Sequence, residues 1–152
     1  MDRRQVLQVG LSALAGAIAA GEDGVEAQVA GQPPPPPATN AKPLGAHPLG
    51  APFEGWQGTM LEVTYPPGAE SAAHMHPGPT FGYVVSGKVR WAINGEAPRV
   101  LEAGQSFFEP MGSVHSTSAN ASATEPARLS VVILAKPGEP LSRPAVKPSG
   151  GQ

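Results

Sequence analysis

The sequence predicts an all-β domain, and three observations carry this prediction. Short runs of apolar residues alternate with polar residues, as they do on half-buried strands. Turn-forming Gly, Pro and Asn residues separate these runs at short intervals. No window places apolar residues at i, i+3, i+4 and i+7 between helix-capping residues. Several short strands with turns this frequent predict a sandwich or a barrel.

The first strand is expected within residues 59–65 (TMLEVTY), where apolar and polar side chains alternate. Leu61, Val63 and Tyr65 would share one face of this strand. Residues 81–85 and 88–93 are predicted to be the next two strands, joined by a tight turn at Ser86-Gly87. In the second of them, the side chains of Val89, Trp91 and Ile93 should face one way and those of Lys88 and Arg90 the other.

Asn94-Gly95 follows as a strong hairpin signal. Residues 99–104 and 106–110 are predicted to supply two further strands, and a long polar loop should come next. Residues 128–135 (RLSVVILA) are apolar on both faces, which is typical of a buried strand. The strands are therefore expected to lie within residues 53–136, which form the predicted barrel.

Residues 1–27 are predicted to be a signal peptide. Arg3 and Arg4 precede an uncharged run over residues 9–20, which is shorter than the roughly 20 apolar residues that span a bilayer. The segment resembles a twin-arginine export signal, which implies a periplasmic or extracellular protein with no stable membrane span after cleavage. A short amphipathic helix is the alternative, although the run has no polar face beyond Ser12.

Two cleavage sites and two loose segments follow from the same pattern. Residues 25–27 (VEA) fit a cleavage site, and residues 17–19 (AIA) are a second candidate. Residues 28–52 are predicted to be a Pro-rich linker, because the five consecutive prolines within them favour a polyproline II spacer. Residues 137–152 have a similar composition and are predicted to be a flexible tail.

Composition excludes several classes of protein. The formal net charge is −2 and no cluster of Lys and Arg is present, so the sequence carries no nucleic-acid signature. The chain contains no Cys, which excludes disulfides and thiolate metal sites. A metal site in this chain must therefore use nitrogen and oxygen ligands.

Three of the four histidines form a candidate metal site. Side chains alternate along a strand, so His74 and His76 should point the same way. If the chain packs His115 against them, three imidazole nitrogens could surround one ion at ~2.0–2.2 Å. Each histidine alone is more often a surface or hydrogen-bonded residue than a ligand. His47 lies outside this pattern and is expected at the surface.

Two motifs of glycine, proline and histidine resemble those of the cupin superfamily. In the first, five residues separate Gly68 from His74 and His76, then three residues lead to Thr80 and six more to Gly87. The second motif contributes Gly104, Pro110, Gly112 and His115, all in register. Its Asn position holds Ala119, and Asn120 comes one residue late. The resemblance covers most of residues 53–136 and implies the cupin double-stranded β-helix, a jelly-roll barrel.

The chain departs from the cupin pattern at Thr80, where the family has a carboxylate ligand. A neutral hydroxyl is a poor ligand, so Thr80 is expected to touch a bound water or nothing. Three neutral nitrogens suit Fe, Ni, Cu or Zn as divalent ions. Similar three-histidine sites occur in cupin dioxygenases such as cysteine dioxygenase, so loss of the carboxylate need not end metal binding.

Glu109 is the only acid beside the second motif, and two interpretations of it are open. It could face solvent from a strand, as an exposed strand residue does. Alternatively, it could be a fourth ligand, fix the tautomer of a ligating imidazole, or serve as the catalytic base. The aromatic side chains are expected in the core, and some should line the pocket mouth. Site-lining residues beside Thr80 are then Tyr83, Trp91 and Phe107, while Phe81 and Phe108 are expected to be core.

The resemblance implies a small-molecule ligand or substrate, and three functions stay open. The first is a quercetin-dioxygenase-like enzyme that uses oxygen on a small enolic or phenolic substrate. The second is a non-catalytic cupin that binds a small molecule or a metal, and the third is a structural barrel with a vestigial site. A homodimer is expected, because the exposed edge strands of so short a barrel need covering.

Overall fold

The structure, a computed structural model, describes residues 37–145. The predicted signal peptide, its cleavage sites, most of the proline run and the end of the predicted tail lie outside the described residues. Within residues 37–145 all regular secondary structure is β, and no helix there could cross a membrane. The all-β prediction is confirmed.

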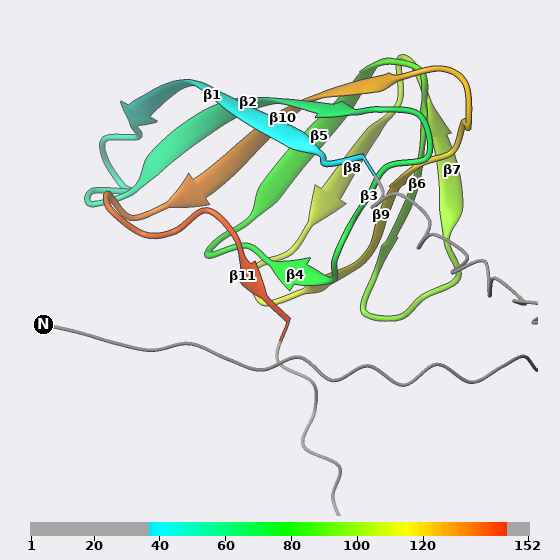
Figure 1. Cartoon of the computed structure of the whole chain (residues 1–152). Helices are drawn as coiled ribbons and strands as arrows, with labels where there is room; N and C mark the ends of the chain where they lie inside the picture. Colours follow the sequence, from blue (N-terminus) through cyan, green and yellow to red (C-terminus); the bar gives the residue numbers. More distant parts are fainter. Residues whose placement is uncertain (1–36, 146–152) are drawn as a thin grey trace, which may run out of the picture. The chain divides into compact units, whose positions relative to one another are not determined.

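Two antiparallel sheets face each other and enclose the core (Figure 1). The first sheet has the order β1-β2-β10-β5-β8, and the second has the order β11-β4-β9-β6-β7 with β3 also paired to β9. The strands are β1 (Asn40–Pro48), β2 (Gln57–Tyr65), β3 (Glu70–Ser71), β4 (His74–Met75), β5 (Thr80–Ser86), β6 (Lys88–Ile93), β7 (Arg99–Glu102), β8 (Ser106–Glu109), β9 (Val114–Asn120), β10 (Ala127–Ala135) and β11 (Arg143–Pro144). This arrangement is a jelly-roll, as expected.

The period of two in the apolar pattern places the core where it was predicted. On β2, Leu61 and Tyr65 are buried between the sheets while Met60 is exposed. On β6, Val89 and Trp91 are buried while the charged side chains beside them face solvent. Strand alternation therefore suffices to orient both strands.

The turn at Gly87 joins two sheets rather than two paired strands. β5 belongs to the first sheet and β6 to the second, so the two strands do not form a hairpin with each other. Gly87 has a φ of 75°, and a Cβ there would lie 2.5 Å from the carbonyl oxygen of Pro126. The sharp corner thus requires glycine both for its backbone angle and for space.

The predicted polar loop after residue 110 is wrong, because residues 114–120 form β9. This strand pairs with β3, β4 and β6, and so lies at the centre of the second sheet. Its sequence VHSTSAN has almost no apolar side chain to signal burial, and the buried side chains of Ser118 and Asn120 form hydrogen bonds instead. Asn120, for example, donates to three backbone carbonyl oxygens.

The predicted limits of the barrel are wrong at both ends. Residues 40–48, assigned to the linker, form β1 and pair with β2 along its full length. Pro43 and Pro48 are tolerated because β1 is an edge strand, and the register shifts between Pro43 and Gly45. At the other end, residues 143–144 form β11 and pair with β4. Both added strands flank the candidate site.

Candidate metal centre

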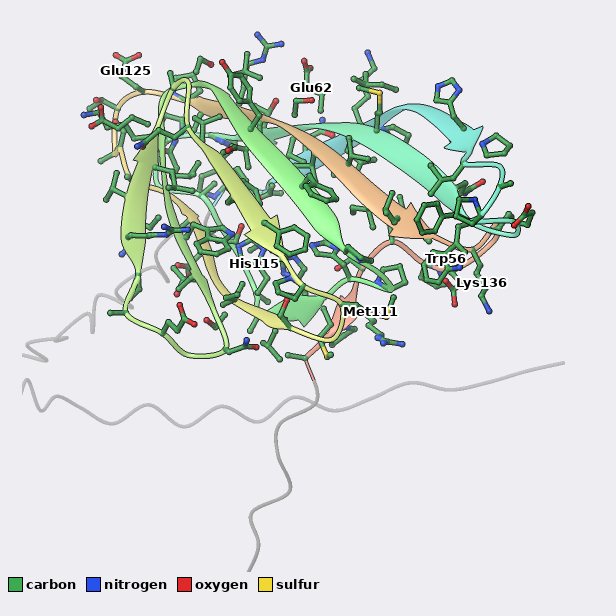
Figure 2. The ribbon with its side chains drawn as sticks, turned by 180° about the vertical axis from the view of Figure 1, so that it is seen from behind. Trp56, Glu62, Met111, His115, Glu125 and Lys136 are labelled. Atoms are coloured by element: carbon green, nitrogen blue, oxygen red, sulfur yellow. The ribbon has the colours of Figure 1, made fainter. Side chains whose placement is uncertain are left out.

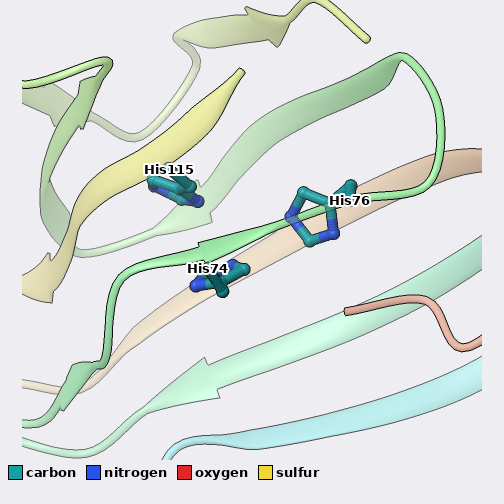
Figure 3. Close-up of side chains that lie close together, drawn as sticks. All are labelled: His74, His76 and His115. Atoms are coloured by element: carbon teal, nitrogen blue, oxygen red, sulfur yellow. The ribbon is translucent and has the colours of Figure 1, made fainter. Parts of the chain in front are cut away.

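The fold brings three histidines into one group that could hold a metal ion (Figure 3). One ligand nitrogen from each of His74, His76 and His115 lies within 4.8 Å of the other two. His74 and His115 are direct partners across β4 and β9, and His76 follows β4 by one residue. The strand alternation that predicts a shared direction for His74 and His76 therefore places both beside His115. His115 lies inside the fold, whereas Glu62 and Lys136 project from its periphery (Figure 2).

Backbone carbonyls hold two of the three rings in place. The Nδ1 atom of His74 lies 2.8 Å from the carbonyl oxygen of Ala72, and that of His76 lies 2.7 Å from the carbonyl oxygen of Leu141. A carbonyl accepts only, so each Nδ1 carries the proton and donates it. The Nε2 atom of each ring is then left with a free lone pair, as a metal ligand requires.

His115 is buried without a hydrogen-bond partner for either ring nitrogen among the described residues. Such an orphaned imidazole is costly in a protein interior, and a cation would give it a partner. Burial, with smaller contributions from the neighbouring imidazoles, lowers the pKa of His115 to about 3. The pKa of His76 is also lowered, mainly by burial. These two rings are therefore neutral at pH 7, which is the form that binds a metal, so the donor set fits a divalent ion.

Thr80 lies fully buried on β5 and lines the same cavity as the histidines. Its hydroxyl donates to the carbonyl oxygen of Gly78 at 3.3 Å. The cross-strand partner of Thr80 is Glu109 on β8. A carboxylate thus stands on the strand next to the one where the cupin pattern places it.

Glu109 is buried, with 2% of its surface exposed, so the interpretation as a solvent-facing residue is wrong. Its Oε1 atom lies 3.1 Å from Nδ1 of His115, a contact without hydrogen-bond geometry, and Oε2 lies 3.6 Å from Nε2 of His76. The indole nitrogen of Trp91 donates to Oε1 at 3.3 Å. Burial raises the pKa of the Glu109 carboxyl from 4.5 to about 7, while the bond from Trp91 acts in the opposite direction.

The three histidines open into a cavity of about 700 Å³ between the sheets. Its apolar walls come from β2, β10 and β8, through Leu61, Val63, Leu129, Val131, Ile133 and Phe107. Residues of β1 and of the segment around β11 complete the lining. Apolar walls with a few polar groups are typical of a site for a small molecule.

The predictions for the aromatic residues are only partly correct. Phe107 lines the cavity, and Trp91 is buried and contacts Glu109. Tyr83, predicted to line the site, faces outward with 48% of its surface exposed. Phe81 and Phe108, predicted as core, also lie on the outer face, at 51% and 46% exposure. The inward-facing residues of β5 are instead Thr80, Gly82 and Val84. Gly82 has no side chain, which leaves room for the ring of Phe107.

Sequence reasoning missed the carbonyl of Leu141 and a set of hydroxyl side chains on the cavity wall. The hydroxyl side chains are Thr39, Tyr65, Ser71 and Ser118. Ser and Thr are common in loops and on surfaces, so nothing in their type marks them as part of a cavity. Of these four residues, only Tyr65 could be placed from sequence, because it shares one strand face with Leu61 and Val63.

Comparison with known families and structures agrees with this architecture. The profile described as "Cupin domain" matches residues 61–133. No curated protein matches the chain in sequence.

Among solved structures, a protein with a double-stranded β-helix domain from Klebsiella pneumoniae is 22% identical with a TM-score of 0.51, over 64% of this chain and 83% of the other. A cupin-like protein from Thermotoga maritima is 25% identical with a TM-score of 0.50, over 62% and 67%. A structure described under the DMSP lyases RdDddP and RnDddQII is 22% identical with a TM-score of 0.54, over 71% of this chain and 53% of that one. At 22% identity the first and third likenesses show the fold alone.

Proposed function

We propose a metal-dependent function for this chain, on the premise that it is a member of the cupin superfamily, as the domain match and the shared fold support. In this proposal His74, His76 and His115 hold one divalent transition-metal ion, with Fe, Ni, Cu and Zn as the candidates. The observation that carries the proposal is the buried His115, whose two ring nitrogens find no partner among the described residues although the imidazoles of His74 and His76 lie beside it.

The chemistry we favour is an oxygen-dependent dioxygenase acting on a small enolic or phenolic molecule. A bound ion with three protein ligands would supply open positions at which such a substrate and dioxygen could meet. The chain supplies the rest. The apolar walls exclude water, and the carbonyl oxygens of Ala72 and Leu141 keep the imidazoles aimed at one point.

Glu109 is our candidate for the catalytic base. It lines the cavity and lies within 3.6 Å of two of the histidines, so it can reach a molecule seated beside them. In this role one of its oxygens accepts the acidic proton of the enol or phenol. Trp91 fixes the orientation of the carboxyl group through the indole hydrogen bond.

A second candidate is a non-catalytic cupin that retains a small molecule or the metal itself. Thr80 favours this alternative, because it replaces the carboxylate that the cupin pattern places in the first motif. Its hydroxyl is already engaged with Gly78 and offers no charge to an ion.

Metal analysis of the full chain purified from its native host tests the shared part of both candidates. We expect about one transition-metal ion per chain in the wild type and in His47→Ala, a control in the exposed part of β1. His115→Ala should lose the ion while keeping its circular dichroism spectrum. A wild type free of metal would contradict the proposal and favour a structural barrel.

Oxygen uptake separates the enzyme from the binding module. The metal-loaded protein is mixed with flavonols, catechols or 1,3-diketones, and dioxygen consumption is followed. Turnover that His115→Ala abolishes supports the dioxygenase. Tight ligand retention without oxygen uptake supports the non-catalytic candidate instead.

The proposal includes export and self-association. The twin-arginine-like segment is the basis for export to the periplasm or cell exterior, which fractionation of the native host tests. A homodimer would cover open strand edges, since β8 and β7 each have one neighbour in the described sheets.

A further inference from the structure

Four hydroxyl side chains gather on one wall of the cavity. They come from different elements: Tyr65 ends β2, Ser71 ends β3, Ser118 lies in β9, and Thr39 directly precedes β1. All four line the cavity that also holds the three histidines. We call this set the hydroxyl cluster. Tyr65 and Ser118 are buried, and the other two are half-buried.

Hydrogen bonds connect the cluster into a chain with a defined direction. Ser71 donates to Thr39 at 3.3 Å, so its hydrogen is used there. The hydroxyl of Tyr65 lies 3.2 Å from Ser71 and must therefore be the donor of that bond. Tyr65 and Ser118 are also hydrogen-bonded, and by the same reasoning Ser118 donates. Four hydroxyl hydrogens serve three bonds, so the hydrogen of Thr39 remains available within the described part of the chain.

The cluster lies at a defined spacing from the histidines. His115 pairs with His74 across the sheet, and Ser118 pairs with Ser71 three residues further along β9. At the rise of a β-strand this separates the two levels by about 10 Å. The wall between them is apolar and is formed by Leu61, Val63, Leu129 and Val131. The cavity thus offers polar groups at two levels and an apolar surface between them.

We propose that the hydroxyl cluster is a second subsite, which binds the far end of an elongated neutral ligand whose near end occupies the histidine centre. The ligand class has an enolic or phenolic oxygen at one end, an apolar or aromatic middle, and a hydroxyl or carbonyl oxygen at the other. This inference rests on the proposed function, because it concerns the ligand of the same site. The oxygen at the far end accepts the hydrogen of Thr39.

The charges around the cluster favour a neutral group over an ionised one. The cluster itself carries no formal charge, and the acidic Glu70 lines the cavity beside Ser71. Arg143 is the only Lys or Arg among the described lining residues, and it pairs with Met75 in the strand that carries His74. An anionic end at the cluster would meet a carboxylate and no cation nearby.

Two probes that differ by one oxygen test the proposal. These are 4-phenylcatechol and 4-(4-hydroxyphenyl)catechol. Only the second has a hydroxyl at its far end, and this hydroxyl lies about as far from the catechol oxygens as the two levels of the cavity lie from each other. The full chain is loaded with cobalt(II), binding of each probe is titrated by calorimetry, and the visible spectrum reports contact with the metal. We expect the probe with the distal hydroxyl to bind about fivefold more tightly, as one added neutral hydrogen bond implies.

Thr39→Val and Thr39→Ala both remove the donating hydroxyl, so each should reduce this ratio to about one while leaving the affinity for 4-phenylcatechol unchanged. Ser130→Ala is the matched control, because Ser130 is a half-buried hydroxyl residue of β10 that does not line the cavity. Thr39→Val keeps the shape of the Thr39 side chain, which directly precedes the edge strand β1, so this variant remains informative if Thr39→Ala is unstable.

The outcomes distinguish failure of the second subsite from failure of the proposed metal centre. If both probes change the cobalt spectrum but bind equally well, or if the variants keep the preference, the second subsite is overturned and the metal centre stands. If cobalt binds but neither probe changes its spectrum, the proposed function fails and the inference fails with it.

Discussion

Glu109, His76 and His115 lie together, and burial favours the neutral form of each. Burial raises the pKa of the carboxyl to about 7 and lowers the pKa values of His76 and His115. The pKa of the acid rises and the pKa values of the bases fall for the same reason, because burial removes the water that stabilises a charge. A divalent cation would reverse the preference of the carboxyl, because it favours an ionised partner nearby.

Replacement of Glu109 by Gln tests this environment in the metal-free protein. The folded-state pKa of about 7 lies above the ordinary 4.5, so the folded form keeps a proton that the unfolded chain loses first. The wild type therefore loses stability as the pH rises through this window. Relative to it, Glu109→Gln should gain up to about 3 kcal/mol between pH 4.5 and 7.

Urea denaturation of both proteins in the presence of a chelator measures the difference. Both proteins contain the same histidines, so the contribution of these histidines to the pH dependence largely cancels in the comparison. A difference in unfolding free energy that stays constant across the window would show that folding does not raise the pKa of Glu109.

The histidine group could be predicted from sequence, whereas the position of Glu109 could not be settled. The spacing of His74 and His76 on a strand fixes their common direction. In residues 106–109 two adjacent phenylalanines hide the period of two, because both look like core residues. Only the structure shows that Phe107 points inward with Glu109 while Phe108 points out.

At the scale of elements, β5 and β8 fit together because β5 has no side chain at Gly82. A Cβ at this position would lie 1.9 Å from the Phe107 ring, which is buried in the core. Gly82→Ala should therefore destabilise the protein by about 1–3 kcal/mol through overpacking, as measured by thermal or urea unfolding.

Gly58→Ala is the matched control for Gly82→Ala. Gly58 lies in β2 of the same sheet, and a Cβ there would meet its nearest neighbour at 3.6 Å, an ordinary contact. The control should be neutral or stabilising by about 0.5 kcal/mol. Equal losses in both variants would mean that strand glycines matter here for some reason other than space.

The segment that ends in β11 supports the site through its backbone. Removing the chain after Lys136 takes away the carbonyl of Leu141 that holds His76, together with β11 beside His74. We expect metal affinity to fall at least tenfold, measured by competition with a chelator. A chain that ends at Ala145 keeps these contacts and should bind like the full chain. Equal affinity in the two truncated chains would contradict the support role.

Two elements escaped sequence analysis for opposite reasons. β9 is largely buried but polar, so no alternation of apolar residues indicates a strand there. Its pairing with β3, β4 and β6 is nevertheless extensive. β1 contains prolines, which argue against a central strand but permit an edge. In both cases the decisive factor is the place of the strand in the sheet, which a single sequence does not state.

For the whole molecule, the outer face of the first sheet carries exposed aromatic residues. The rings of Phe81 and Phe108 lie 4.9 Å apart on neighbouring strands, and Val132 is the partner of Phe81 on β10. We predict that the protein is a homodimer in solution and that Phe81→Asp shifts it toward monomer, because a buried unpaired charge opposes association.

Analytical ultracentrifugation across a range of concentrations measures the shift. Val100→Asp is the control, since Val100 is equally exposed but lies on β7 of the other sheet. A wild type that stays monomeric at high concentration would refute the dimer. A shift toward monomer in Val100→Asp alone would place the interface on the second sheet.

Both ends of the folded region help to build the cavity wall, and this dictates an order of events during synthesis. The ring of His76 acquires its backbone support only when Leu141 has left the ribosome, after nearly every other part of the site has emerged. A nascent chain stalled before that point carries all three imidazoles without a fully supported centre. In the proposed metalloprotein, loading with an ion should therefore follow the emergence of Leu141 rather than that of the histidines.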